Sequence, residues 1–235
     1  MVTMPNNQGL FDLSFQYSLE CNLSCSFCMY EGGPDKTEVL NLIDLLTFIN
    51  TIDFALINSV GLYGGEPTLH LDAYNRIAAM LPTTTPIWMI SNGAWSKDPD
   101  RLVDLIRWCR AIGLRRLIVS GNPEQVKHQD ARALHVLSEE CPEAVTLKEP
   151  DGSMLMMGRL AHRWDGVCSG KCSWKKSDPT RIAVTPPGDI MFQTCDGSYP
   201  VIGNISQPFS QIAEICRDFN HKTCSGLPRA FGETK

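Results

Sequence analysis

The chain has 235 residues, of which 43% are hydrophobic and 20% are charged. This composition suits one full-sized folded domain with at most a small appendage, and it excludes a disordered or fibrous protein. The net charge of -5, without a long basic run, argues against nucleic acid as the main partner. No apolar run approaches the roughly 18 residues of a membrane span, and the first ten residues lack signal-peptide features, so we expect a cytoplasmic protein with no membrane partner.

Strands and helices are predicted to alternate through the first 150 residues. Apolar and polar side chains alternate over 11–19, which is typical of a half-buried strand, and helical spacing of apolar residues follows over 36–50. The same order repeats in strands at 59–63, 86–91, 115–120 and 144–149, separated by helices near 70–81, 99–112 and 123–140. This alternation indicates βαβ units, a parallel sheet and a site at the carboxyl ends of the strands. Because five strands are too few for a closed eight-fold barrel, we expect an open or partial α/β barrel.

The remainder of the chain has a different composition. Five of the ten cysteines lie after residue 151 among many glycines and prolines, with one clear helix at 209–219. We therefore predict two domains, a barrel over 1–150 and a small cysteine-rich domain over 151–235. In the reducing cytosol such a density of thiols indicates metal ligands or redox groups rather than a disulfide framework.

Three cysteines lie close together directly after the first predicted strand. Cys21, Cys25 and Cys28 have the spacing C-x3-C-x2-C, and three thiolates this close can converge on one metal centre. Four-iron clusters are usually held by four cysteines, so three protein ligands would leave one iron open to a substrate or cofactor. A zinc site and unrelated thiols are the alternatives.

Short motifs also follow the next strands. Gly64-Gly65-Glu66-Pro67 ends the second strand, Ser91-Asn92-Gly93 ends the third, and the stretch 119–132 follows the fourth. Two glycines let a backbone approach a ligand closely, and a glutamate can accept a hydrogen bond from an ammonium group. Taken singly, the first motif could be a strand-to-helix turn and the second a plain turn.

Taken together and in order, these motifs resemble the radical S-adenosylmethionine (SAM) superfamily. In that family C-x3-C-x2-C follows the first strand of a partial (βα)6 TIM-like barrel, and SAM chelates the open iron of a 4Fe-4S cluster. The resemblance implies that the GGEP motif binds the SAM amino group, that Phe27 lies near the adenine unless it is a core aromatic, and that Ser120 and Arg132 contact the ribose or carboxylate. The implied SAM-binding residues are Phe27, Gly64, Gly65, Glu66, Pro67, Ser91, Asn92, Ser120 and Arg132. Gly121-Asn122 stands where the family usually has Asp-Gly, so no role is carried to that position.

The second group of cysteines resembles the Twitch and SPASM extensions of that superfamily, which hold one or two auxiliary iron-sulfur clusters. Five cysteines are too few for two clusters, so the resemblance implies one auxiliary 4Fe-4S cluster with Cys168, Cys172, Cys195 and Cys224 as ligands. A set that uses Cys216 and a zinc site are the alternatives. Cys216 falls on the apolar face of its helix, as does Cys109 on another, and Cys141 ends a helix, so we expect these three to be structural.

The resemblance implies a radical SAM enzyme that cleaves SAM reductively to a 5′-deoxyadenosyl radical and abstracts a hydrogen atom from its substrate. An auxiliary cluster implies an oxidative outcome, and we expect dehydrogenation or bond formation on a small metabolite. Modification of a ribosomal peptide or protein side chain is the alternative within the class, and a non-catalytic iron-sulfur or zinc protein is the alternative outside it. The enzyme would need an electron donor such as flavodoxin or ferredoxin.

Overall fold

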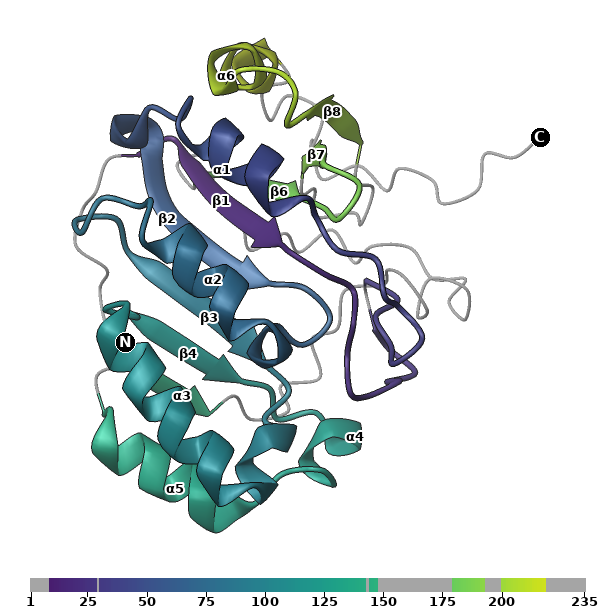
Figure 1. Cartoon of the computed structure of the whole chain (residues 1–235), viewed down its shortest axis with the longest axis vertical. Helices are drawn as coiled ribbons and strands as arrows, with labels where there is room; N and C mark the ends of the chain where they lie inside the picture. Colours follow the sequence, from purple (N-terminus) through teal and green to yellow (C-terminus); the bar gives the residue numbers. More distant parts are fainter. Residues whose placement is uncertain (1–8, 29, 143, 148–178, 193–199, 219–235) are drawn as a thin grey trace, which may run out of the picture.

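The computed structural model describes residues 9–28, 30–142, 144–147, 179–192 and 200–218 (Figure 1). They form one eight-stranded sheet in the order β5-β4-β3-β2-β1-β6-β7-β8. The strands are β1 (Phe11–Gln16), β2 (Ile57–Tyr63), β3 (Ile87–Ser91), β4 (Arg116–Val119), β5 (Val145–Leu147), β6 (Thr180–Val184), β7 (Asp189–Phe192) and β8 (Val201–Asn204). The six strands β5, β4, β3, β2, β1 and β6 are parallel to their neighbours in the sheet. β7 pairs antiparallel with β6, and β8 pairs antiparallel with β7. The predicted α/β class with a mainly parallel sheet is therefore confirmed.

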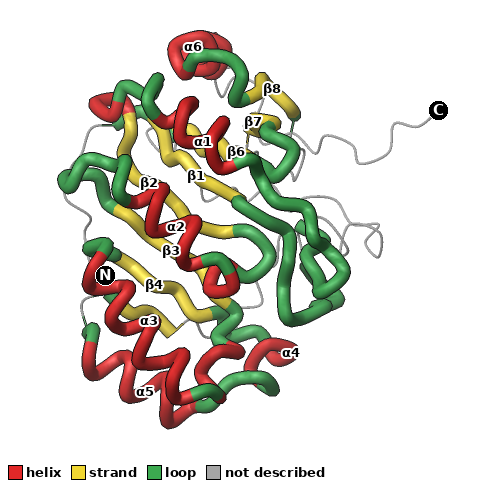
Figure 2. The backbone as a smooth tube through the Cα atoms, viewed as in Figure 1, coloured by secondary structure: helices red, strands yellow, loops and turns green. Residues whose placement is uncertain are grey.

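Helices connect the parallel strands, and Figure 2 shows α1, α2 and α3 lying over the same face of the sheet. The helices are α1 (Leu42–Ile49), α2 (Leu71–Ala78), α3 (Pro99–Ala111), α4 (Pro123–Val126), α5 (Ala131–Glu140) and α6 (Phe209–Asp218). Three short 3-10 turns, η1 (Phe54–Leu56), η2 (Pro67–Leu69) and η3 (Ala94–Lys97), lie at strand or helix ends. None of the described helices is long and apolar enough to cross a membrane.

The core lies between the sheet and these helices. Leu13, Phe15 and Leu62 are fully buried on one face of β1 and β2. Ser14 and Tyr63 on the other face are buried too, so these central strands are covered on both faces. Phe209 of α6 packs edge-on against Phe11 of β1, with ring centroids 5.8 Å apart. The described part of the carboxyl-terminal region therefore shares both the sheet and the core with the first 150 residues.

The position of β6 differs from the position it would have in a barrel whose strands are arranged in the order of the sequence. In such a barrel the sixth parallel strand would lie beside the fifth, but here β6 pairs with β1, and β5 and β8 form the two edges of the described sheet. The described sheet is thus open. The partial (βα)6 barrel and the domain boundary at residue 150 stay predictions, since residues 148–178 lie outside the described part.

Two predicted helices are shorter than their apolar spacing suggests. The helix expected at 36–50 begins only at Leu42, because Asn41 caps it: its Oδ1 accepts from the backbone N–H of Ile43 at 3.0 Å and of Asp44 at 3.3 Å. Residues before the cap lie along the loop after β1, where the Leu40 N–H donates to the Tyr17 carbonyl at 2.8 Å.

The helix expected at 123–140 is divided in two. Asp130 caps α5 by accepting from the N–H groups of Arg132 and Ala133, and the chain bends between α4 and α5. The bend points the Gln129 amide at the carbonyls of Asn92 and Ser120, 2.7 Å from each. Apolar spacing continues across this bend, so periodicity alone predicts one helix where a tertiary contact makes two.

Candidate metal and cofactor site

The sequence motifs meet at one edge of the sheet. Because β1 to β4 are parallel, their carboxyl ends point the same way, and the segments that follow them lie side by side (Figure 1). These segments are the cysteine loop after β1, the Gly64–Pro67 turn after β2, the Ser91–Gly93 loop after β3 and the Ser120–Asn122 loop after β4. Residues up to about 100 positions apart in sequence are thereby brought together, as predicted.

Within the cysteine loop the three thiols differ in exposure. Cys21 is buried at 8% exposure, while Cys25 and Cys28 are partly exposed. Burial raises the pKa of the Cys21 thiol, and burial together with the neighbouring thiols raises the pKa of Cys25 to about 11. Thiols in such a setting stay protonated without a cation, and a metal centre would release their protons on binding.

Zinc ions and four-iron clusters differ in how their ligands are arranged. Among the described residues, no three His, Cys, Asp or Glu side chains lie close enough together to bind one metal ion. A zinc ion needs its ligands around a single centre, whereas the cysteines of a four-iron cluster bind different irons and stand further apart.

Gly64 and Gly65 let β2 end directly against the segment that leads into Cys21. The Gly65 N–H donates to the Ser18 carbonyl and the Glu66 N–H to the Glu20 carbonyl, each at 2.8 Å. A Cβ at position 64 would lie 2.2 Å from the Ser18 oxygen, and one at position 65 would lie 2.1 Å from the Glu20 oxygen. The close approach expected of these glycines is therefore made to the protein's own backbone, whatever ligand is also present.

The Glu66 carboxylate is buried and held by hydrogen bonds from the chain. It is 1% exposed and accepts four hydrogen bonds: Oε1 from the Thr68 N–H at 3.2 Å, the Thr68 hydroxyl at 2.7 Å and the Ser91 hydroxyl at 2.8 Å, and Oε2 from the Asn92 N–H at 2.7 Å. Burial raises the pKa of Glu66, and these four donors oppose that rise. A carboxylate has about four acceptor positions. Three of the four bonds go to Oε1 and one to Oε2, so an ammonium group could donate to the remaining position of Oε2 or to a backbone carbonyl of this turn.

The Ser-Asn-Gly motif is a hydrogen-bonded loop rather than a plain surface turn. The Ser91 hydroxyl accepts from the Gly93 N–H at 3.1 Å and from the Trp95 indole N–H at 2.7 Å. Gly93 has a φ of +75°, a conformation that favours glycine, and a Cβ there would lie 2.7 Å from the side chain of Val119. The loop presents the Asn92 side chain to Cys21, with Nδ2 at 3.5 Å from Sγ.

The remaining predicted SAM ligands differ in how closely they join this edge. The Ser120 N–H donates to the Ser91 carbonyl at 2.9 Å, so the fourth strand is tied to the third at the site. Pro67 is buried at the start of η2, and Phe27 is partly exposed in the cysteine loop. Arg132 is exposed in the first turn of α5, and no described contact joins its side chain to these loops. The roles of these residues toward SAM stay predictions.

Glu124 is a residue of the site that the sequence did not reveal. Its carboxylate accepts from the Ser26 N–H at 2.8 Å and also from the Ser26 hydroxyl, so α4 holds the cysteine loop between Cys25 and Cys28. Together with Cys25 and Lys127 it borders a cavity of about 170 Å³. A glutamate in the first turn of a helix is common, so only the contact across 98 residues identifies its role.

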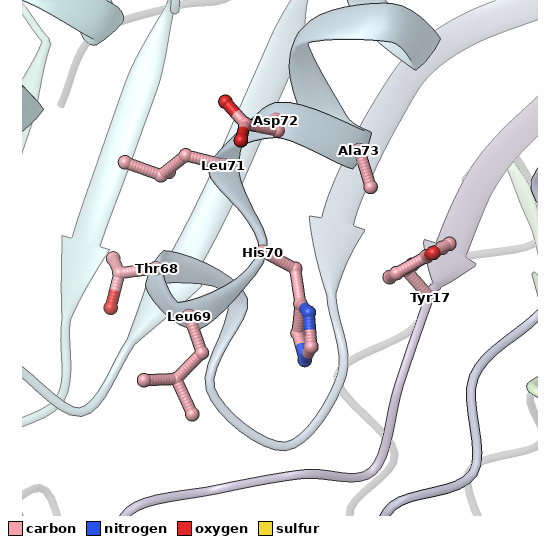
Figure 3. A pocket seen from close by; sticks show the side chains of 7 residues that line it. All are labelled: Tyr17, Thr68, Leu69, His70, Leu71, Asp72 and Ala73. Atoms are coloured by element: carbon pink, nitrogen blue, oxygen red, sulfur yellow. The ribbon is translucent and has the colours of Figure 1, made fainter.

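A larger cavity of about 370 Å³ lies beside the turn that follows the GGEP motif (Figure 3). Tyr17 and residues 68–73 line it, and the His70 ring points between η2 and Tyr17. His70 Nε2 lies 3.2 Å from Glu20 Oε2, and burial lowers the pKa of His70 although Glu20 raises it. The sequence placed His70 inside a helix, whereas it precedes α2.

The other described cysteines lie in α3, at the end of α5 and in α6, at the helical positions that the sequence predicts. Cys109, Cys141 and Cys216 are all buried, and burial raises the pKa of Cys109 and Cys216 to about 12. Cys216 packs among Phe209, Ile212 and Ala213, which disfavours it as a ligand of an auxiliary cluster. The predicted ligands Cys168, Cys172, Cys195 and Cys224 lie outside the described residues.

No protein-family model matches the chain, but several curated proteins do. The chain is 34% identical to a GTP 3′,8-cyclase of Synechococcus elongatus over 105 residues. These residues make up 43% of this chain and 30% of that protein. Over 112 residues the chain is 32% identical to a probable GTP 3′,8-cyclase of Saccharolobus islandicus, covering 47% and 34% of the two chains. The match thus spans about a third of the length of these relatives. The relatives are enzymes, and they support the radical SAM superfamily that the cysteine motif indicates.

Solved structures give weaker similarities. One similar structure is described as native anSMEcpe with bound AdoMet, and the similarity covers 89% of this chain and 83% of that one. Another is Streptococcus suis SuiB bound to precursor peptide SuiA, where it covers 87% of this chain and 64% of that one. The identities are 14% and 12%, and the TM-scores are 0.47 and 0.38. Similarity at this level does not support an argument about function.

Proposed function

We propose that the chain is a radical SAM enzyme whose Cys21, Cys25 and Cys28 hold a 4Fe-4S cluster. The observation that supports this most is the convergence of four motifs on one edge of the sheet, with hydrogen bonds from the β2 and β3 segments to the cysteine loop. A chance C-x3-C-x2-C spacing would not require a GGEP turn and a Ser-Asn-Gly loop to be built against it.

The residues of this edge fit the needs of such a site. Three thiolates would bind three irons, and the cluster would supply an open iron and one electron for the reductive cleavage of SAM. The described chain contributes the positioning: Gly64 and Gly65 bring β2 against the loop, Glu66 fixes the β3 loop, and Glu124 fixes the Ser26 turn. The low exposure of Cys21 and Glu66 keeps water from this side of the site, which a radical reaction requires.

The reaction we propose is hydrogen-atom abstraction by a 5′-deoxyadenosyl radical, followed by oxidation of a small metabolite through dehydrogenation or bond formation. The names of the curated relatives, cyclases of GTP, agree with a small-molecule substrate. The sheet face away from the helices also carries polar and aromatic groups suited to one. On it the Ser14 hydroxyl donates to the Tyr63 hydroxyl at 2.9 Å, and the Tyr63 and Trp88 rings lie 5.0 Å apart. A peptide substrate is the second candidate within this class.

Two further parts of the proposal concern electrons. We propose that Cys168, Cys172, Cys195 and Cys224 hold an auxiliary 4Fe-4S cluster that accepts the electron of the substrate radical. A flavodoxin or ferredoxin would reduce the cluster that binds SAM. Both parts follow from the likeness of the sequence to the Twitch and SPASM extensions.

The experiment that tests the function is anaerobic reconstitution with iron and sulfide, followed by dithionite and SAM. We expect 5′-deoxyadenosine and methionine from the wild type and neither from a Cys21→Ala, Cys25→Ala, Cys28→Ala triple variant. The matched control is Cys109→Ala with Cys216→Ala, which should form 5′-deoxyadenosine as the wild type does. A wild type that loads iron and forms no 5′-deoxyadenosine would instead be a non-catalytic iron-sulfur protein.

A further inference from the structure

The side chain of Asn92 forms a direct link between the β3 loop and the first cysteine. Its Nδ2 lies 3.5 Å from the Cys21 Sγ, and the same sulfur accepts from the Leu23 N–H at 3.4 Å. Both Asn92, at 5% exposure, and Cys21, at 8%, are buried. A hydrogen bond to sulfur at a buried position is stronger than it would be in water, because the surroundings screen charge less.

The orientation of the Asn92 amide is fixed by its other contacts. Its Oδ1 accepts from the Ala94 N–H at 2.9 Å, so the NH2 group must face Cys21 and the Asn22 Oδ1, which lies 2.8 Å away. Its backbone is held as well, since the N–H donates to Glu66 and the carbonyl accepts from Gln129. Asn92 is therefore preorganised as a donor to the sulfur.

We propose that Asn92 is a positioning residue that acts on the cluster through Cys21 and raises its reduction potential. This inference rests on the proposed function. Reduction adds one negative charge to a cluster, and part of that charge resides on the cysteine sulfurs. A donor at the sulfur stabilises the reduced form more than the oxidised form, so it eases the delivery of an electron.

This role differs from direct contact with SAM, which the family resemblance implies for Asn92. Both N–H groups of its amide and its Oδ1 already have partners within the chain. A bond from this side chain to SAM would have to replace one of them. Loss of the amide should therefore change the potential of the cluster before SAM is added.

The test is a potentiometric titration of the reconstituted full chain, followed by EPR, in the absence of SAM. The signal to follow is the one that the Cys21, Cys25, Cys28 triple variant lacks. Asn92→Ala removes the donor and the acceptor for Ala94 without adding charge, so it carries the test. Asn92→Asp keeps the size and the acceptor but replaces the donor by a negative charge, which lowers the potential further, so its shift should be at least as large. For each we expect about a tenfold lower ratio of reduced to oxidised cluster at a fixed potential, which is about 59 mV for a one-electron couple. Asn22→Ala removes the second partner of the amide and the Asn22 Oδ1 that accepts from the Cys21 thiol at 3.9 Å. A thiolate bound to iron has no proton to donate, so this variant should leave the ratio unchanged.

The outcomes separate this inference from the function on which it rests. A wild type without the EPR signal would contradict the proposed function itself. Unchanged potentials in both Asn92 variants, with iron content like the wild type, would overturn the inference alone. So would loss of the cluster in both variants while Asn22→Ala keeps it, since that would assign Asn92 to assembly rather than to the potential.

Discussion

The described cysteines occupy two contrasting regions of the molecule. Cys21, Cys25 and Cys28 lie in a loop at the carboxyl edge of the sheet, among hydrogen-bond donors and one another. Cys109, Cys141 and Cys216 lie in α3, at the end of α5 and in α6, and Cys109 and Cys216 belong to the apolar core. The same residue type is thus placed to bind a metal in one region and to fill space in the other, and its neighbours decide which.

The edge is held by backbone contacts and buried polar groups, whereas the core is held by apolar packing. Gly65 and Glu66 bond to the chain just before Cys21, and Glu66 joins β2 to the β3 loop. Hydrogen bonds of this kind depend on direction, so the loss of one donor or acceptor affects the loops that it joins. Apolar packing is less directional, so an exchange that keeps the volume of a side chain costs little.

Gly65→Ala should have the largest effect on the stability of the carboxyl edge of the sheet. Its Cβ would meet the Glu20 carbonyl oxygen at 2.1 Å, and both partners are backbone. We expect a loss of about 3 kcal/mol or more in the free energy of unfolding, together with loss of reconstituted iron. Urea unfolding and iron analysis measure these two quantities.

Gly113→Ala is the matched control for that substitution. Gly113, unlike Gly65, has a positive φ, +62°, and a Cβ there would meet nothing within 4 Å. The cost should be about 1 kcal/mol from backbone conformation alone, with normal iron content. Equal stability of Gly65→Ala and the wild type would show that the edge does not depend on close backbone approach.

Glu66→Gln should have the next largest effect. The substitution replaces one acceptor oxygen by an NH2 group, so at least one of the four buried donors that face the carboxylate loses its partner. We expect a loss of about 2 kcal/mol in the free energy of unfolding. Thermal and urea unfolding of the apoprotein would measure it, and an unchanged midpoint would mean that this carboxyl does not organise the β3 loop.

Cys216→Ala tests the other side of the comparison. The substitution removes one sulfur from a packed site beside Phe209 and Ile212, so it should cost about 1 kcal/mol and leave the iron content of the reconstituted chain unchanged. Cys21→Ala should do the reverse and lose the cluster that binds SAM. Lower iron in Cys216→Ala would identify Cys216 as a ligand of the auxiliary cluster.

The smallest expected effect concerns His70 and pH. Burial lowers the pKa of His70 in the folded chain below its unfolded value of about 6.5, so the unfolded chain takes up a proton first as the pH falls. The folded chain should therefore lose stability as the pH falls below about 6.5. In His70→Gln this part of the pH dependence should be absent, as urea midpoints between pH 5 and 7 would show. If His70→Gln lost more free energy of unfolding than the wild type between pH 7 and pH 5, the contact of His70 with Glu20 would outweigh the effect of burial.

Much of the fold could be predicted from the sequence because its strands are short and regular. Alternation over β1 and the apolar runs of β2 to β4 predicted their positions, and Asp98 before Pro99 begins α3 as capping rules expect. The bend between α4 and α5 could not be predicted, since Gln129 acts through carbonyls of distant residues. The pairing of β6 with β1 is likewise a long-range contact that local periodicity does not encode.

The site shows the same division. Cys21, Gly64, Gly65, Glu66 and Asn92 could be selected from motifs, because their order at successive strand ends is visible in the sequence. Their partners could not be selected in this way. The sequence does not show that Glu66 faces Ser91 rather than a ligand, or that Glu124 holds Ser26, because both contacts depend on how the loops fold over the edge.

The most direct test of the account is EPR of the reduced, reconstituted chain before and after SAM is added. We predict a 4Fe-4S signal that changes when SAM is added, is lost in the Cys21→Ala, Cys25→Ala, Cys28→Ala variant, and persists when Cys109 and Cys216 are replaced by alanine. A signal that does not respond to SAM, or one that survives in the first variant and responds as the wild type does, would contradict the assignment of the carboxyl edge as the site that binds the cluster and SAM.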